Sequence, residues 1–126
     1  MKPRESTLRI LRFEAAEKVR KVSDLESMIR EFDQMAVDLE RQVATEEDRT
    51  GIKDPAHFSY STFAKAAAQR RINLLESVDD LRLKLEAAIQ DRDMALESLN
   101  RAEDDSSRET PRQRRRGDTS PLVRLG

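Results

Sequence analysis

GIKDPAHFSYSTFAKAAAQRR, residues 51–71, is the stretch that decides the fold of this 126-residue chain. Asp, Glu, Lys and Arg make up 39% of the sequence, yet residues 55–64 contain none of them. Those few positions hold three of the chain's five aromatic side chains, namely Phe58, Tyr60 and Phe63. An uncharged aromatic segment at the middle of so charged a chain marks an interruption in whatever regular structure surrounds it.

The residues inside this stretch indicate a turn between two helices. Gly51 is a residue type that commonly ends a helix, because glycine adopts the left-handed conformation needed there. Asp54 followed by Pro55 favours a turn. Ser61 supplies a side chain suited to capping the start of a new helix. We therefore expect one helix to end near Gly51 and another to begin near Ser61.

On both sides of the turn, apolar residues recur with the alternating 3–4 spacing of a coiled coil. Before the turn the two seam positions read Leu8, Ala15, Val22, Ile29, Ala36, Val43 and Leu11, Lys18, Leu25, Phe32, Leu39, Glu46. After the turn the seam reads Tyr60, Ala64, Ala67, Arg71, Leu74, Val78, Leu81, Leu85, Ala88, Arg92, Ala95, Leu99, Ala102. Nearly all of these residues are apolar, and β-branched or aromatic runs typical of strands are missing.

The pattern predicts an all-α fold, a long antiparallel two-helix coiled-coil hairpin over residues 4–103. Helix one should occupy about residues 4–50, the turn about 51–60, and helix two about 61–103. Residues 104–126 are rich in Ser, Pro, Gly and charge without a helical period, which predicts a disordered tail.

The distribution of charge also favours antiparallel pairing. Residues 1–22 carry a net charge of +4 and would face residues 88–103, which carry −2. Residues 24–48 carry −7 and would face residues 62–86, which carry +1. Opposite signs therefore meet at both ends of the expected hairpin, as charges flanking a coiled-coil seam do.

Composition argues against several classes of function. The net charge of −1 does not favour general binding to nucleic acid or to an anionic membrane surface. Cysteine is absent and His57 is the single histidine, so we expect no metal site and no catalytic triad. There is no glycine-rich phosphate loop, no membrane-length apolar run and no signal-peptide pattern. We expect a cytoplasmic protein that is not an enzyme and uses no cofactor.

Two segments leave alternatives open. The arginine-rich run at residues 112–116 is read as part of a solvated tail, although it is also suited to phosphates or anionic lipid. Phe58, Tyr60 and Phe63 either fold back over the end of the hairpin or form a surface for a partner, since aromatic side chains dominate binding hot spots. Composition alone favours neither of these two interpretations.

The central block GIKDPAHFSYSTFAKAAAQRR, with the INL that follows it, resembles the flagellar export protein FliJ family in its alphaproteobacterial form. An opening RESTLRILRFEAAEKVRKV and the segment DLESMI at residues 24–29 lie upstream in the matching order. The similarity covers roughly residues 4–100, and its specific part is the DPAHF turn. After about Asn100 the chain departs from the family pattern.

The resemblance implies a stalk and coupling component of flagellar type III protein export, which supports flagellum assembly and motility. Its expected partners are the hexameric export ATPase, the membrane export gate protein and substrate chaperones, and it would lie at the inner membrane without inserting. Carried over by position, the gate contact would use Phe58, Tyr60, Phe63, Gln69 and Arg70. The contact with the ATPase ring would use Arg4, Arg9 and Arg12. The alternative is a cytoplasmic export chaperone or adaptor that binds unfolded flagellar substrates.

Overall fold

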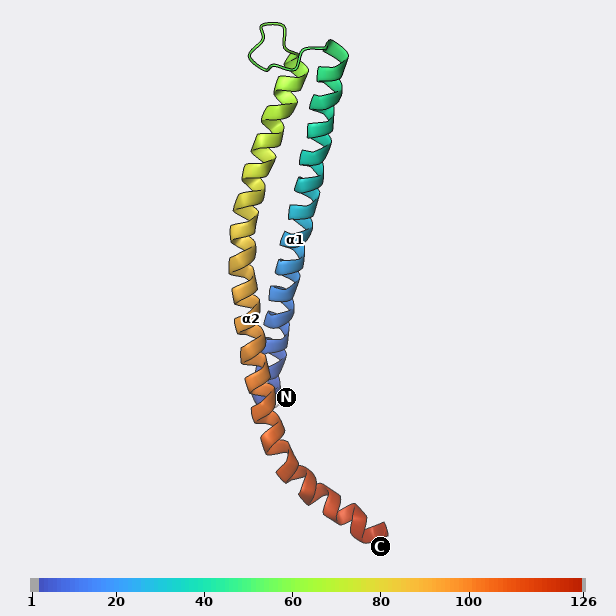
Figure 1. Cartoon of the computed structure of the whole chain (residues 1–126). Coiled ribbons are helices and arrows are strands. Elements are labelled where there is room, and N and C mark those ends of the chain that lie inside the picture. The colour runs from blue at the N-terminus through green and yellow to red at the C-terminus, as the bar shows by residue number, and fades with distance from the viewer. Residues whose placement is uncertain (1–2, 126) are drawn as a thin grey trace. The chain divides into compact units, whose positions relative to one another are not determined.

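A computed structural model describes the backbone of residues 3–125 and the side chains of residues 4–108. It contains two helices, α1 (Pro3–Thr50) and α2 (Thr62–Leu125), and no strand within the described backbone. The two helices pack against each other and are joined by a loop at residues 51–61 (Figure 1). The predicted all-α helical hairpin is confirmed.

The chain divides into two compact units. The loop unit, residues 21–88, contains the second part of α1, the connecting loop and the first part of α2. The terminal unit combines residues 1–20 with residues 89–126. Within each unit, the α1 and α2 segments run antiparallel and lie side by side (Figure 1).

The core of the loop unit is a narrow seam of small and medium-sized side chains. Every predicted seam residue is buried or half-buried, so the 3–4 pattern identified the contacting faces correctly. The fully buried members in this unit are Val22, Leu25, Ala36, Ala64, Ala67, Val78, Leu81 and Ala88. Because half of these are alanines, the seam removes comparatively little apolar surface from water.

Ion pairs across the seam agree with the charge argument. In the loop unit, Arg71 Nη2 lies 3.8 Å from Glu40 Oε2, and Arg82 Nη2 lies 3.8 Å from Asp33 Oδ2. Each pair joins the acidic α1 segment to the basic α2 segment. Such exposed pairs contribute little stability individually, but they show which residues of the two helices lie at the same level along the hairpin.

The terminal unit buries Leu8 and Ala15 on α1, and an ion pair joins Arg12 Nη2 to Glu103 Oε2 at 3.4 Å. Helix α2 does not end near residue 103, where the sequence pattern fades, but extends to Leu125. The charged and serine residues directly after this point lack glycine and proline, so nothing in them stops a helix. The prediction of disorder falls largely on residues 109–126, whose side chains lie outside the described part.

Candidate functional site

The loop begins with a glycine that turns the chain out of α1. Gly51 has φ of +75°, in the left-handed region, and its N–H donates to the carbonyl oxygen of Glu47 at 2.8 Å. The Thr50 hydroxyl accepts from the N–H of Ile52 at 3.2 Å. These bonds satisfy backbone groups at the end of the helix and set the direction in which the loop leaves it.

Two successive turns follow. The N–H of His57 donates to the carbonyl oxygen of Asp54 at 3.0 Å, with Pro55 in the position that proline favours in a turn. The Asp54 side chain also accepts from the N–H of Ala56 at 2.9 Å. The N–H of Tyr60 then donates to the carbonyl oxygen of His57 at 3.0 Å. The loop therefore has a defined backbone conformation built from local hydrogen bonds.

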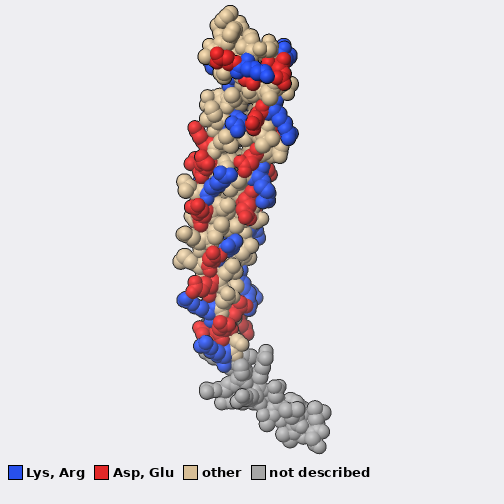
Figure 2. Space-filling view, viewed as in Figure 1, with Lys and Arg blue, Asp and Glu red and all other residues tan. Residues whose placement is uncertain are grey.

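This conformation presents Phe58 to solvent. The Phe58 ring is 95% exposed and stacks on the His57 ring, with centroids 4.7 Å apart and planes at 21°. His57 Nδ1 accepts from the N–H of Ser59 at 3.0 Å, which holds the imidazole beneath the stacked ring. Phe63 is also 54% exposed. In Figure 2 the end of the loop unit is largely uncharged, with acidic and basic side chains directly below it.

The far side of the loop is fastened to the end of α1 by two carboxylates. Ser61 caps α2, since its hydroxyl accepts from the N–H of Ala64 at 3.2 Å, and the same hydroxyl donates to Glu46 Oε1 at 3.0 Å. The Tyr60 hydroxyl donates to Glu47 Oε2 at 2.7 Å. We call Glu46, Glu47, Tyr60 and Ser61 the latch, because these four residues tie the end of α1 to the start of α2.

The pKa values of two latch residues are shifted, and for Glu46 the largest cause is Arg49, which lies outside the latch. Hydrogen bonding from Arg49 and then from Ser61 lowers the pKa of Glu46 below its ordinary value, although partial desolvation opposes this. The hydrogen bond to Glu47, followed by desolvation and the Glu47 charge, raises the pKa of Tyr60 above its ordinary value. A neutral phenol and an ionised Glu46 are therefore the forms that hold the loop.

The structure separates the five residues assigned to the gate contact. Phe58 and Phe63 are exposed, whereas Tyr60 is half-buried and its hydroxyl is engaged in the latch. Gln69 is exposed on α2 and its amide donates to Asn73 Oδ1 at 3.1 Å. At 1.5 Å per residue, it lies about 9 Å along α2 from Phe63. The set predicted from the sequence therefore combined the exposed Phe58 and Phe63 with Tyr60 and Gln69, whose side chains hydrogen-bond to other residues of the chain.

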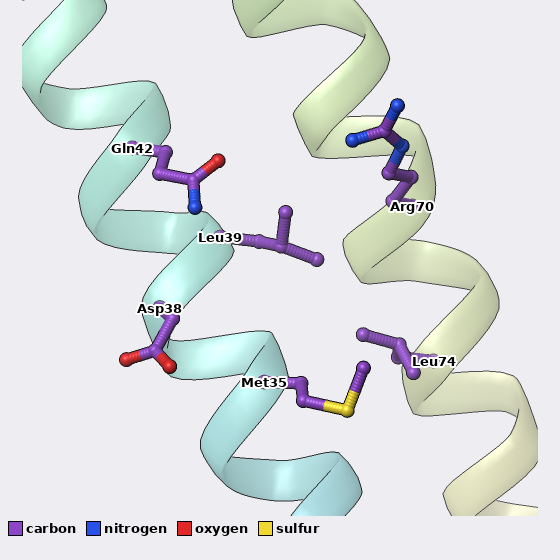
Figure 3. Close-up of a pocket in the computed structure, with 6 residues that line it drawn as sticks. All are labelled: Met35, Asp38, Leu39, Gln42, Arg70 and Leu74. Carbon is purple, nitrogen blue, oxygen red and sulfur yellow. The ribbon is translucent and has the colours of Figure 1, made fainter.

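Arg70 belongs to a different surface feature, a groove of about 440 Å³ between α1 and α2 in the loop unit. Figure 3 shows the apolar side chains in the middle of this groove and polar ones around it. The lining residues are Met35, Asp38, Leu39, Gln42, Arg70 and Leu74.

The three arginines assigned to the ATPase ring lie on α1 in the terminal unit. Arg4, Arg9 and Arg12 are all exposed, and Arg12 forms the ion pair with Glu103. Next to them, Phe13 is 66% exposed. Sequence reasoning did not identify Phe13, because a single aromatic outside the seam positions is not distinctive without knowing which face of the helix is covered.

The latch carboxylates were also missed. The only available signal was a pair of adjacent acidic residues, Glu46 and Glu47, in the last turn of the first helix, opposite the serine-capped start of the second. That signal becomes informative only once the path of the loop is known.

The residues whose side chains are described contain no group of three or more His, Cys, Asp or Glu placed to hold a metal ion. No helix in the described part is long and apolar enough to cross a membrane. Comparison with known proteins found no matching family model, no matching curated protein and no matching solved structure.

Proposed function

We propose that this chain is a non-enzymatic stalk and coupling component of flagellar type III protein export. In this proposal it is a cytoplasmic protein, peripherally associated with the inner membrane at the export apparatus. It binds the export ATPase hexamer through its terminal unit and the membrane export gate through its loop. The proposal rests on the resemblance of residues 51–71 and the upstream segments to the FliJ family.

The observation that carries the proposal is the 95% exposure of Phe58 on a loop whose backbone is held by its own hydrogen bonds. A large apolar ring kept in water by a fixed backbone is the arrangement of a binding anchor, because little conformational entropy is lost when a partner covers it. Of the two interpretations of the aromatic side chains, folding back over the hairpin applies to Tyr60 and an exposed surface applies to Phe58. Tyr60 packs back onto α1, while Phe58 faces outward.

At the terminal unit, Arg4 and Arg9 are exposed, whereas Arg12 contacts Glu103. A ring surface lined with carboxylates would first attract an exposed cation that takes part in none of the described ion pairs, so Arg9 is the better candidate for a direct contact. Arg12 would act more weakly, by holding α1 against α2. This assignment refines the set carried over from the family.

Mechanically, a single copy of this two-helix chain has no internal symmetry that matches a six-fold ring. Its binding would therefore favour different states in different ATPase subunits, and ring binding and gate binding would be linked through one chain. No bond is made or broken by the stalk itself. We expect it to raise turnover of the cognate export ATPase without hydrolysing nucleotide.

The test is ATPase turnover with purified cognate export ATPase, with and without this chain. We expect wild-type chain to raise turnover, Arg9→Ala to reduce that effect, and Arg30→Ala, an exposed arginine in the loop unit, to leave it intact. A deletion strain should lose swimming motility and regain it with the wild-type gene. No effect on turnover together with normal motility of the deletion strain would overturn the proposal.

The exposed Phe58 and Phe63 also suit a second candidate, an export chaperone or adaptor that holds unfolded flagellar substrates. The two functions differ in what the double variant Phe58→Ala with Phe63→Ala disrupts. A chaperone would lose substrate binding while stimulation of the ATPase persisted. A stalk would lose gate binding instead, with substrate binding unaffected.

A further inference from the structure

One flank of the loop unit carries a face whose two edges have opposite charge. The groove beside it places Asp38 on α1 and Arg70 on α2 around Met35, Leu39 and Leu74 (Figure 3). Residues seven apart in a coiled coil lie in one row along the helix. We call the resulting surface the flank face, and it has three parts. The acidic row is Asp24, Glu31 and Asp38, the central apolar strip is Met28, Met35, Leu39 and Leu74, and the basic row is Arg70 and Lys84.

The centre of this face is apolar and incompletely covered. Met28 is 41% exposed and Met35 is 49% exposed, while Leu39 and Leu74 are half-buried. Methionine is a flexible, polarisable side chain that adapts to surfaces it packs against. A strip of such residues along a seam rich in alanine leaves apolar surface that a second layer of helices would remove from water.

The opposite flank of the same unit behaves differently. There the charged side chains pair within the chain, because Glu40 meets Arg71 and Asp33 meets Arg82 across the seam. On the flank face, none of the described ion pairs joins a charged side chain of α1 to one of α2. Both flanks carry acids on α1 and bases on α2, so the flank face differs in leaving these charges available.

The two charged rows of the flank face are nearly without partners. Among the described contacts, Asp24, Glu31, Arg70 and Lys84 take part in no ion pair or side-chain hydrogen bond. Asp38 contacts side chains of its own helix alone: it accepts a hydrogen bond from Gln34 Nε2 at 3.1 Å and lies 3.9 Å from Arg41 Nη1. An apolar strip with an acidic edge and a basic edge that form no ion pair with each other among the described contacts is complementary to itself.

We propose that a second copy of this chain docks on the flank face, forming a symmetric dimer of loop units. A two-fold axis parallel to the helices places α1 of one copy opposite α2 of the other, so that each acidic row meets a basic row. A two-fold axis across the helices would instead place acidic row on acidic row. Charge therefore selects the arrangement in which both loops lie at the same end of the dimer.

The levels of the charges fit this arrangement. Because Leu39 and Leu74 line one groove, a residue of α1 lies beside the α2 residue for which the two numbers sum to about 113. Lys84 is therefore level with about residue 29, only ~3 Å along the axis from Glu31 at 1.5 Å per residue. Arg70 is level with about residue 43, ~7 Å from Asp38. Glu31 with Lys84 of the other copy is the better-aligned contact.

The size of the loop unit sets an upper limit on the interface. The named residues of the flank face span about 24 Å of α1; if the contact extends along residues 21–50, it spans about 45 Å, and two packed helices about 20 Å wide then give at most roughly 900 Å² per copy. A stable protein–protein interface needs about 800 Å² per partner. The dimer uses the loop unit alone and forms apart from the ring, where the proposed stalk acts as a single copy, so it goes beyond the proposed function and does not depend on it.

Sedimentation of the full chain across a concentration series, at low and high salt, tests the proposal. We expect a monomer–dimer equilibrium in which Glu31→Lys weakens association about tenfold or more, since like charges then face each other at two symmetric contacts. Lys84→Glu should act in the same way. Combining the two substitutions should restore the dimer and return the net charge to that of the wild type.

Glu26→Lys is the matched control, because Glu26 is exposed on α1 outside the flank face and the change in net charge is identical. Circular dichroism checks that each variant stays helical. A monomer at all concentrations, or a double variant no better than the single variants, would overturn the proposal. So would equal weakening by Glu26→Lys.

The direction of the two copies has its own test, since the chain has no cysteine and Ser59→Cys introduces a single label position. Spin labels at this loop position should be separated by less than about 45 Å in the dimer, because both loops lie at the same end. Labels separated by more than about 45 Å, the length of the α1 segment, would indicate opposed copies and contradict the charge argument.

Discussion

Replacing Gly51 with alanine should destabilise the hairpin through backbone conformation alone. Gly51 has φ of +75°, a region in which an L-residue with a Cβ is strained by about 1–2 kcal/mol. A Cβ built at this position meets no atom within 4 Å, so no steric clash is added. Alanine also restricts the unfolded chain, but that gain requires a compatible native φ, which is lacking here. We expect Gly51→Ala to lower the free energy of unfolding by about 1 kcal/mol, roughly a fivefold change in the equilibrium constant.

Urea unfolding followed by circular dichroism at 222 nm measures this change. Gly51→Asn is the matched variant, because asparagine enters the left-handed region more readily than alanine and should lose less stability. The expected order of stability is therefore glycine, then asparagine, then alanine. An alanine variant as stable as the wild type would show that the chain does not need a left-handed residue at the end of α1, and would refute the reasoning about the loop.

Four further predictions concern the seam, the latch and the terminal unit. Val78 is 1% exposed, so Val78→Ala should lower the free energy of unfolding by about 2 kcal/mol in a urea titration. Because the pKa of Glu46 is lowered in the folded chain, ionised Glu46 stabilises the fold above pH 4.5, its ordinary pKa, and this stability is lost as the pH falls through the lowered pKa. Glu46→Gln should therefore flatten the acid side of the stability–pH curve. The raised pKa of Tyr60 adds stability below pH 10 that is lost as pH rises through the raised pKa, and Tyr60→Phe should flatten the alkaline side. The Arg12–Glu103 pair has side chains 58% and 43% exposed, so a double-mutant cycle should give a coupling of only about 0.2–1 kcal/mol, decreasing with salt.

The helices and their contacting faces could be predicted from the sequence because both depend on local, repeating signals. The seam residues recur with a fixed spacing, and the end of α1 at Gly51 and the cap at Ser61 each follow from one residue type. The extent of α2 was underestimated. Its predicted end rested on the fading of the seam, but the backbone hydrogen bonds of a helix do not require a buried face, and α2 continues through Pro111, Gly117 and Pro121.

The arrangement of the loop could be predicted only in part. That Phe58 is exposed and Tyr60 is tied to Glu47 depends on which way each of two turns directs the chain, and composition does not contain that information. The same holds for the flank face. Its rows are visible in the sequence as seven-residue repeats, but which charges already pair across the seam became clear only from the contacts of Arg71 and Arg82.

The central claim is the proposal that the export gate binds the loop between α1 and α2, with Phe58 as the anchor of the contact. Titrating the soluble domain of the gate with wild-type chain, Phe58→Ala and Leu83→Ala tests it most directly. Leu83 is 66% exposed on α2 of the loop unit, so its variant removes a comparable apolar side chain elsewhere. We predict that Phe58→Ala weakens binding about tenfold or more while Leu83→Ala binds as the wild type does. Equal affinity of Phe58→Ala and the wild type would contradict the account.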